Sequence, residues 1–188
     1  MQNLLANPEH SVVVAVDPQP GFLKAIPNSE DLIKRGIFLS KVAEILEIPV
    51  ILNEQNPQKM GSIDERLLKV INKYESNLPK NTFSCCENPV FMEQLDTLQR
   101  NQVFLWGIET HICMAQTTIQ LLHEDYDVFV VADATGCRSE LAHQIGIQRM
   151  RDTGAIITHS ESVTYEWLGT CDHPKFRDVL AVVKEYAQ

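Results

Sequence analysis

The chain has 188 residues, of which 44% are hydrophobic and 22% charged, so it is long enough to bury a sizeable core in a single domain spanning residues 1–188. Sixteen Lys and Arg against 25 Asp and Glu give a net charge of −9, which disfavours nucleic acid and anionic membranes as partners. No apolar run approaches the roughly 18 residues of a membrane span, and the first residues lack the pattern of a secretory signal. Five cysteines without framework or zinc-binding spacing indicate reduced thiols, so we expect a cytoplasmic protein, with mitochondria and other intracellular compartments left open.

The first predicted strand covers residues 11–16, an apolar and largely β-branched run that is typical of a strand buried on both faces of a parallel sheet. Two prolines and a glycine follow at once, so Asp17 lies at the carboxyl end of this strand. Open α/β sheets bind their ligands at this edge, and a carboxylate placed there is costly without a partner. A role for Asp17 in capping a turn is the alternative.

A helix and a second strand come next. Residues 28–46 begin with helix-start residues and carry an apolar stripe, which predicts a helix that covers the sheet. Residues 48–52 predict a buried strand that leads into a polar loop at residues 53–57. A weaker pattern at residues 64–73 indicates a short helix. Lys80 follows in a segment without a clear secondary structure, where most lysines are solvated surface charges.

The second half of the chain continues the alternation of strands and helices. We expect strands at residues 103–106, 127–133 and 154–158, and helices at residues 88–98, 107–124, 139–152, 160–168 and 174–186. In the helix at residues 139–152, the side chains expected to face inward are Leu141, Ile145, Ile147 and Met150. This alternation predicts an α/β fold: a three-layer α/β/α sandwich on a mostly parallel, Rossmann-like sheet with right-handed crossovers.

A cysteine occurs where one of these strands turns into a helix. The strand passes through Gly107, and Cys113 lies in or near the first helical turn. Unpaired N–H groups and the helix dipole favour a thiolate at that position, so we expect the pKa of this thiol to lie well below that of free cysteine. A buried cysteine acting as a small hydrophobic side chain is the alternative.

An aspartate, a lysine and a cysteine at one sheet edge could together activate the cysteine as a nucleophile. The lysine keeps the carboxylate charged, and the carboxylate takes the thiol proton and passes it to a leaving amine. Backbone N–H groups at the turn bind the developing oxyanion. Such a site hydrolyses an amide or a related C–N bond through a thioester. The spacing alone leaves open whether Asp17, Lys80 and Cys113 meet.

Four stretches together resemble the isochorismatase-like cysteine hydrolase superfamily, with most similarity to its isochorismatase-domain-containing and YcaC-like subgroup. They are residues 14–22, 53–57, 80–84 and 107–118, in this order and spacing. The resemblance implies a catalytic triad of Asp17, Lys80 and Cys113, a small-molecule substrate and a homo-oligomer. It also implies a cis peptide between Ile108 and Glu109, which would aim the amides of Glu109 and Cys113 at the substrate oxygen.

The chain departs from some relatives at informative positions. Nicotinamidases and pyrazinamidases carry an Asp/His metal site after the second strand, where this chain has Asn53, Glu54 and Gln55, so we expect no catalytic metal and no cofactor. Isochorismatase itself cleaves a vinyl ether without a cysteine nucleophile, so Cys113 favours the amidase-like branch. We assign Cys137 a structural role.

Other candidates are weaker. Gln19, Phe22 and Gln55 either orient a ligand or serve surface and core roles. His111 lies two residues before Cys113, and such positions do not face each other on a helix, so it is expected to line the pocket without forming a dyad. A haloacid-dehalogenase-like phosphatase would need an acid where Gln19 stands, and neither GxGxxG nor a P-loop occurs. The remaining alternative is a catalytically silent fold that binds a metabolite or a partner protein.

Overall fold

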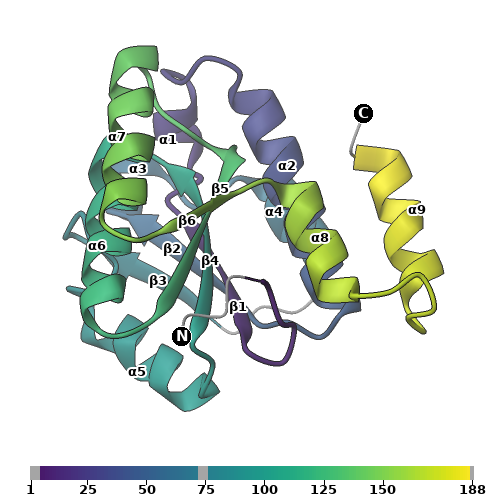
Figure 1. The fold of residues 1–188 in the computed structure, drawn as a ribbon. Coiled ribbons are helices and arrows are strands. Elements are labelled where there is room, and N and C mark those ends of the chain that lie inside the picture. Colours follow the sequence, from purple (N-terminus) through teal and green to yellow (C-terminus); the bar gives the residue numbers. More distant parts are fainter. Residues whose placement is uncertain (1–4, 72–75, 187–188) are drawn as a thin grey trace.

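The computed structural model describes residues 5–71 and 76–186, in which strands and helices alternate along the chain (Figure 1). The elements are β1 (Ser11–Val16), α1 (Pro20–Leu23), α2 (Ser29–Ile45), β2 (Val50–Gln55), α3 (Pro57–Met60), α4 (Glu65–Val70), β3 (Ser76–Lys80), α5 (Pro89–Leu98), β4 (Gln102–Ile108), the π-helical turn η1 (Thr110–Met114), α6 (Ala115–His123), β5 (Asp127–Gly136), α7 (Glu140–Asp152), β6 (Ile156–Thr158), α8 (Ser160–Leu168) and α9 (Phe176–Tyr186). Within these described ranges, no helix is long and apolar enough to cross a membrane.

The strands form one six-stranded sheet in the order β3-β2-β1-β4-β5-β6, and every neighbouring pair is parallel. The chain builds outward from β1 through β2 to β3, then returns to place β4 on the other side of β1. The order therefore reverses between β1 and β4, and ligands of open α/β sheets bind outside the carboxyl ends of the strands at such a point. Asp17 follows β1 and the Cys113 turn follows β4, so both lie there.

Helices cover both faces of the sheet. Alternate side chains of β1 enter different cores: Val13 and Ala15 pack on one face, and Val12 and Val14 on the other. One core includes side chains from α2, α4, α8 and α9, and the other includes side chains from α5, α6 and α7. Because helices cover both faces of the sheet, the sequences of the central strands are continuous apolar runs. The predicted three-layer α/β/α sandwich is confirmed.

Gly107 permits a close approach between β1 and β4. Its φ is +125°, a value that side chains disfavour, and a Cβ at this position would lie 2.1 Å from the carbonyl oxygen of Val16. The pairing with β5 is irregular at the same place: Leu105 pairs with Val130 and Gly107 with Thr135, so the extra residues lie in β5. The glycine thus lets β4 leave the sheet beside the end of β1, which brings the two strand ends of the site together.

Two sequence-based expectations about the strands need correction. Residues 53–55, expected in a loop, are the last three residues of β2, and all three side chains are buried. β3 was not expected because its sequence is polar and contains Pro79. Proline is tolerated on an edge strand, where one side of the backbone has no strand partner, and β3 is the strand at one edge of this sheet.

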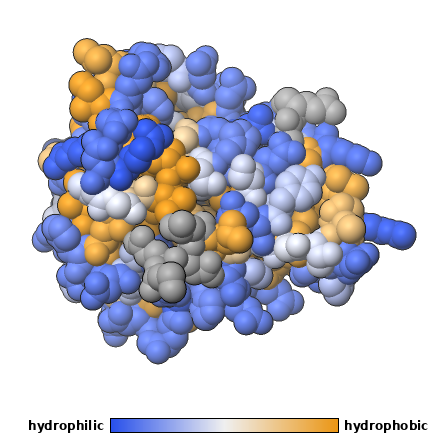
Figure 2. Space-filling model, in the orientation of Figure 1, coloured by the Kyte–Doolittle hydropathy of each residue, from blue (hydrophilic) through white to orange (hydrophobic). Residues whose placement is uncertain are grey.

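The inward face of α7 also differs from expectation. Met150 is buried, but Leu141 and Ile145 are 67% and 58% exposed. Gly146 faces inward instead, and a Cβ there would lie 3.1 Å from the backbone of His111. The helix packs through its glycine, which turns Leu141 and Ile145 toward solvent. Figure 2 shows apolar surface where α7 lies, at the upper left.

Candidate active site

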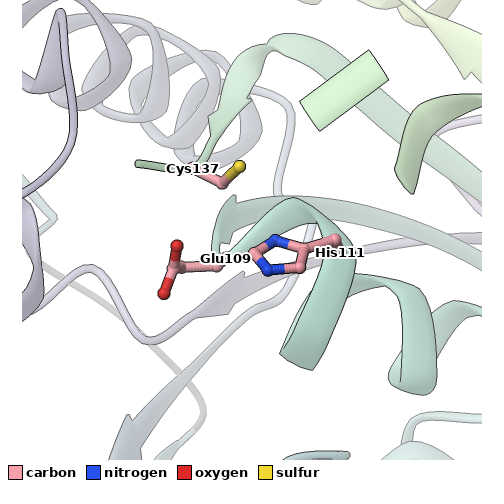
Figure 3. Close-up of side chains that lie close together, drawn as sticks. All are labelled: Glu109, His111 and Cys137. Atoms are coloured by element: carbon pink, nitrogen blue, oxygen red, sulfur yellow. The ribbon is translucent and has the colours of Figure 1, made fainter. Parts of the chain in front are cut away.

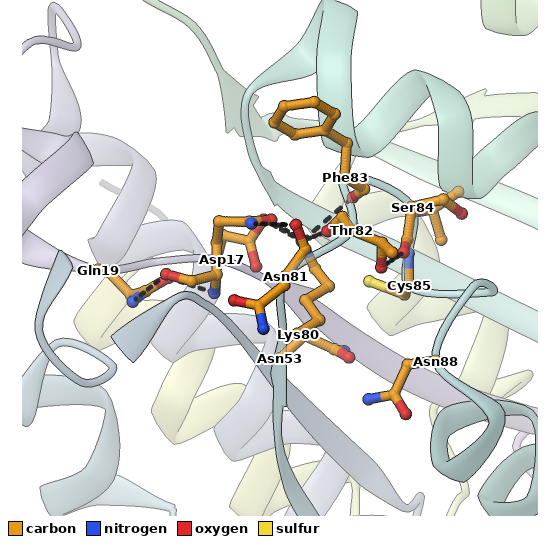
Figure 4. Close-up of polar contacts among 12 residues, drawn as sticks. Asp17, Gln19, Asn53, Lys80, Asn81, Thr82, Phe83, Ser84, Cys85 and Asn88 are labelled. Carbon is orange, nitrogen blue, oxygen red and sulfur yellow. Dashed lines mark hydrogen bonds and ion pairs between the residues drawn. The ribbon is translucent and has the colours of Figure 1, made fainter. Parts of the chain in front are cut away.

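A buried ion pair joins the ends of β1 and β3. The Nζ atom of Lys80 lies 2.7 Å from Oδ2 of Asp17, and these side chains are 0% and 2% exposed (Figure 4). The ammonium also donates to Oε1 of Gln55 at 2.8 Å and to the carbonyl oxygens of Phe83 and Thr82 at 3.1 and 3.3 Å. Full hydrogen bonding of this kind is what makes a buried charge tolerable.

Asp17 has a backbone geometry suited to its position. Its φ of +55° turns the chain sharply at the end of β1, and its N–H donates to the carbonyl of Asn53 at 3.1 Å. While Oδ2 accepts from Lys80, Oδ1 has no hydrogen bond to any residue that the structure describes. That second oxygen is therefore available to accept a proton.

Cys113 lies in η1, at the entry to α6, and is 8% exposed. The carboxylate of Asp17 disfavours the thiolate form of this residue, and the backbone N–H of Glu109 favours it. The turn is held by the carbonyl of Glu109, which accepts from the N–H groups of Ile112 and Met114 at 3.0 and 3.3 Å. The residue expected in a first helical turn is thus found in a wider π-helical turn that precedes the α-helix.

The protonation states follow from burial. Burial raises the pKa of Asp17 to about 6, although Lys80 and the Cys113 thiol both act to lower it. Burial is the largest single effect on the pKa of Lys80 and lowers it, but the attractions of Asp17, Cys85 and Cys113 together outweigh burial, and the net shift is upward. Near neutral pH the pair is therefore ionised.

The expectation of a low pKa for the Cys113 thiol is wrong. Burial, followed by the negative charge of Asp17, raises this pKa to about 12, and the opposing effects of Lys80 and of the Glu109 N–H do not cancel the rise. Lys80 has the largest lowering effect on the pKa of this thiol, but the charge of Asp17, 2.7 Å from the lysine, acts in the opposite direction and is stronger. The resting site therefore holds a thiol next to a carboxylate.

A cavity of about 60 Å³ opens onto these groups. Its lining residues are Asp17, Phe22, Gln55, Phe83, Ile108, Glu109, Ile112 and Cys113. Space of this size holds a few water molecules or a small acyl group. The aromatic and aliphatic side chains give it an apolar wall, while the carboxylate and the thiol supply the reactive end.

The other predicted site residues divide into two groups. Ile108 and Glu109 line the cavity, and the peptide bond between them is cis. Phe22 and Gln55 also line it. Gln19 does not belong to the described lining: it is fully buried, its Oε1 accepts from the N–H of Gln55 at 2.7 Å, and its Nε2 donates to backbone carbonyls.

His111 is also absent from the described residues that line the cavity. Two lining residues, Phe83 and Ile112, were missed as site residues. Phe83 is 56% exposed despite its size and comes three residues after Lys80, so an aromatic side chain next to a candidate catalytic loop was the available signal. Ile112 directly precedes the cysteine, and no sequence signal separates it from a core residue.

The chain is similar to known proteins in sequence and in fold. The isochorismatase domain model matches residues 11–162. Isochorismatase domain-containing protein 1 from Danio rerio is 34% identical over 178 residues, which cover 95% of this chain; the chain spans 62% of that relative's length.

Two solved structures are similar throughout. MAR1 ribonuclease from Caenorhabditis elegans is 33% identical with a TM-score of 0.91, and the alignment covers 96% of this chain and 92% of that one. YcaC from Pseudomonas aeruginosa, at 22% identity, shares the fold with a TM-score of 0.90 over 100% of this chain and 96% of its own. With a family model that covers most of the chain and a fold shared from end to end, the protein belongs to the isochorismatase family of hydrolases.

Proposed function

We propose that this protein is a cysteine-dependent hydrolase that cleaves a small amide or a related C–N bond through a thioester on Cys113. The observation that carries the proposal is the buried Lys80–Asp17 ion pair beside the thiol, at the end of a small cavity. An ion pair enclosed in this way is expensive to maintain, and its one carboxylate oxygen without a described partner supports a role in proton transfer.

The first half of the reaction forms the thioester. The Cys113 sulfur attacks the substrate carbonyl carbon while its proton passes to Oδ1 of Asp17. The C–S bond forms, the carbonyl π-bond opens, and the oxygen takes the negative charge. The N–H of Glu109 favours negative charge on the sulfur, so we infer that it also stabilises this oxyanion, together with the N–H of Cys113. Collapse then breaks the C–N bond, and the amine leaves with the proton from Asp17.

The second half restores the enzyme. A water molecule gives one proton to Asp17 as its oxygen attacks the thioester carbon, and the C–S bond breaks. The sulfur recovers the proton, and the carboxylic acid leaves. Because the thiol has a raised pKa and Asp17 a pKa of about 6, the proton moves during attack and not before it. Lys80 holds Asp17 in its charged form and in position between these steps.

Two alternative functions would give different results in the experiment described below. A catalytically silent member of the fold would bind a small molecule without turnover. A ribonuclease is suggested by the name of the Caenorhabditis elegans relative. Against that reading, the described cavity lining contains two acids and no lysine or arginine, and the chain carries a net charge of −9. Both features oppose binding of a phosphodiester.

The decisive experiment screens small amides, carbamates and ureido compounds with the wild-type protein, Cys113→Ala and the matched control Cys171→Ser, whose cysteine is exposed. Acrylamide belongs in the screen because the YcaC structure from Pseudomonas aeruginosa contains covalent acrylamide. We expect wild type and Cys171→Ser to hydrolyse at least one compound and Cys113→Ala to be inactive. Acid quenching followed by mass spectrometry should find the acyl group on Cys113.

Three results would redirect the proposal. Equal hydrolysis by wild type and Cys113→Ala would exclude the thioester. Binding of a compound without turnover by any variant would favour the silent alternative. Cleavage of RNA by the wild-type protein, with no activity on the small compounds, would favour a ribonuclease.

We also propose that the protein self-associates. YcaC from Escherichia coli is described as an octameric hydrolase of unknown specificity. In this chain, Leu141 and Ile145 expose an apolar stripe on α7 that a second copy would cover. Light scattering coupled to size-exclusion chromatography should give a mass above that of one chain, and Leu141→Glu/Ile145→Glu should reduce it. A monomeric wild-type protein would contradict this expectation.

A further inference from the structure

We propose that Glu109, His111 and Cys137 form a binding site for Zn²⁺, separate from Asp17, Lys80 and Cys113. One potential ligand atom from each of the three residues lies within 4.8 Å of the other two. Figure 3 shows the three side chains close together: Glu109 and His111 come from the segment after β4, and Cys137 comes from the segment after β5.

Strand pairing explains why the three residues meet. β4 and β5 run parallel, and Ile108 is paired with Gly136 in their register. Glu109 and Cys137 are the next residues on each strand path, so both leave the sheet side by side at its carboxyl edge. The η1 turn then brings His111 back over this edge. The cluster therefore arises from the strand register and not from a flexible loop.

A second observation points to a missing ligand. Nδ1 of His111 is buried and has no hydrogen-bond partner among the residues that the structure describes. A buried polar atom left without a partner destabilises the folded chain, and a metal ion bound there would remove that cost. The neighbouring imidazole of His143 is satisfied in the ordinary way, because its Nδ1 lies 2.8 Å from Oγ1 of Thr110.

The donor set selects the class of ion. Imidazole nitrogen, thiolate sulfur and carboxylate oxygen are together the ligands of Zn²⁺, whereas Mg²⁺ and Ca²⁺ bind oxygen. A thiolate and a carboxylate balance the charge of a divalent cation. Three protein ligands leave a fourth tetrahedral position for water. With metal–ligand bonds of about 2.0–2.3 Å, the donor atoms would stand about 3.3–3.8 Å apart, so side-chain rotations must draw them closer by about 1 Å.

Existing contacts of the cluster are weak competitors. Nε of Arg138 lies 3.3 Å from Oε2 of Glu109, but the arginine side chain is 59% exposed, and exposed ion pairs contribute little. The thiol of Cys137 donates to the carbonyl of Ser139 at 3.0 Å, and Zn²⁺ would displace the proton that makes this bond. Neither contact uses the imidazole of His111.

The site would share one residue with the cavity. One carboxylate oxygen of Glu109 lies within 4.8 Å of ligand atoms of His111 and Cys137, while its backbone N–H favours negative charge on the sulfur of Cys113. A metal ion on the carboxylate would therefore hold the peptide group that faces the reactive thiol. Binding itself does not require the hydrolase activity, so the two proposals stand or fall separately.

The test uses Co²⁺ as a spectroscopic substitute for Zn²⁺ on the full chain freed of metal by chelation. Thiolate coordination gives a near-ultraviolet charge-transfer band, and we expect one Co²⁺ per chain, displaced by Zn²⁺. Cys137→Ser should lose the band and more than about tenfold of the Zn²⁺ affinity, since even outer-shell partners contribute that much. Cys171→Ser and Cys113→Ser are the matched controls and should keep both.

Two results would overturn the proposal: absence of the band in the wild-type protein, or loss of the band in Cys113→Ser with retention in Cys137→Ser. Circular dichroism checks that each variant is folded. If Cys137→Ser is not folded, Glu109→Gln replaces it, because the amide keeps the shape but binds Zn²⁺ poorly. Calorimetry with Zn²⁺ should then show the same loss of affinity, and unchanged affinity would count against the site.

Discussion

Two clusters at the carboxyl edge of the sheet contain similar groups but differ in how their charges are paired. At β1 and β3, the carboxylate of Asp17 and the ammonium of Lys80 are both buried and lie 2.7 Å apart. At β4 and β5, among residues 5–71 and 76–186, the carboxylate of Glu109 has only the exposed Arg138 as an ionic partner, and Nδ1 of His111 has no hydrogen-bond partner. In the first cluster the buried negative and positive charges are paired, which fits the proposed proton transfer. In the second cluster the acidic group has no buried cationic partner, which fits the proposed metal ion.

The largest expected effect separates the two acids. Asp17→Asn removes the proposed base but keeps its shape, so hydrolysis of the substrate found in the screen should fall by about 10²–10⁴-fold. Glu109→Gln keeps the backbone N–H that faces Cys113 and should lower the rate by less than about tenfold. Steady-state kinetics of both variants measures the difference. Comparable losses would show that the clusters are not separate in function.

The next effect concerns stability. Lys80→Ala leaves the carboxylate of Asp17 buried without its partner, so the free energy of unfolding at neutral pH should fall by about 3–5 kcal/mol. Lys69→Ala is the matched control: its ammonium lies 3.0 Å from Glu65, both side chains are exposed, and the loss should stay below about 0.5 kcal/mol. Urea denaturation compares the two. Equal losses of unfolding free energy in the two variants would mean that the buried Lys80–Asp17 pair contributes no more to stability than the exposed Lys69–Glu65 pair.

The pH dependence of kcat/KM tests the role of Asp17 as the base in the first cluster. Because burial raises the pKa of Asp17 to about 6, the proposed base is protonated below that pH and cannot accept the thiol proton. We expect kcat/KM to fall about tenfold per pH unit below pH 6 and to level off above it. A rate profile between pH 4.5 and 8 tests this expectation. A plateau that continues down to pH 4.5 would exclude a base with this pKa.

The smallest effect lies in the second cluster. Arg138→Ala removes the exposed ion pair with the Glu109 carboxylate but keeps the hydrogen bond from the backbone N–H of residue 138, so Zn²⁺ affinity should rise a few-fold while the free energy of unfolding changes by less than about 1 kcal/mol. Calorimetry and denaturation measure the two quantities. A loss of affinity would indicate that the arginine supports the cluster instead of competing for it.

How far the sequence predicts this molecule depends on which physical signal each segment carries. Apolar β-branched runs predict the central strands because those strands are buried on both faces. β3 carries no such run, since an edge strand can be polar and contain Pro79. The outward turn of Leu141 and Ile145 depends on Gly146 packing against η1, a contact between segments that periodicity does not encode.

The site shows the same division. Strand ends predict that Asp17 and Cys113 approach each other, because parallel strands share one carboxyl edge. The raised pKa of the thiol was not predicted, since it depends on how deeply the folded chain buries the sulfur and on the neutralisation of Lys80 by Asp17. Cys137 was assigned a structural role for a related reason: its nearness to Glu109 follows from the β4–β5 register, which spacing along the chain does not reveal.

The close crossing at Gly107 limits how this pocket can be redesigned. A side chain at that position would collide with the carbonyl oxygen of Val16, so a substitution there would shift the end of β4, which leads into the lining residues Ile108 and Glu109. Substitutions in the apolar wall of the cavity can change which acyl group fits. The wall residues Phe22 and Ile112 are partly buried, and Phe83 is exposed. Variant libraries for new substrates should therefore diversify these three positions and leave residue 107 unchanged.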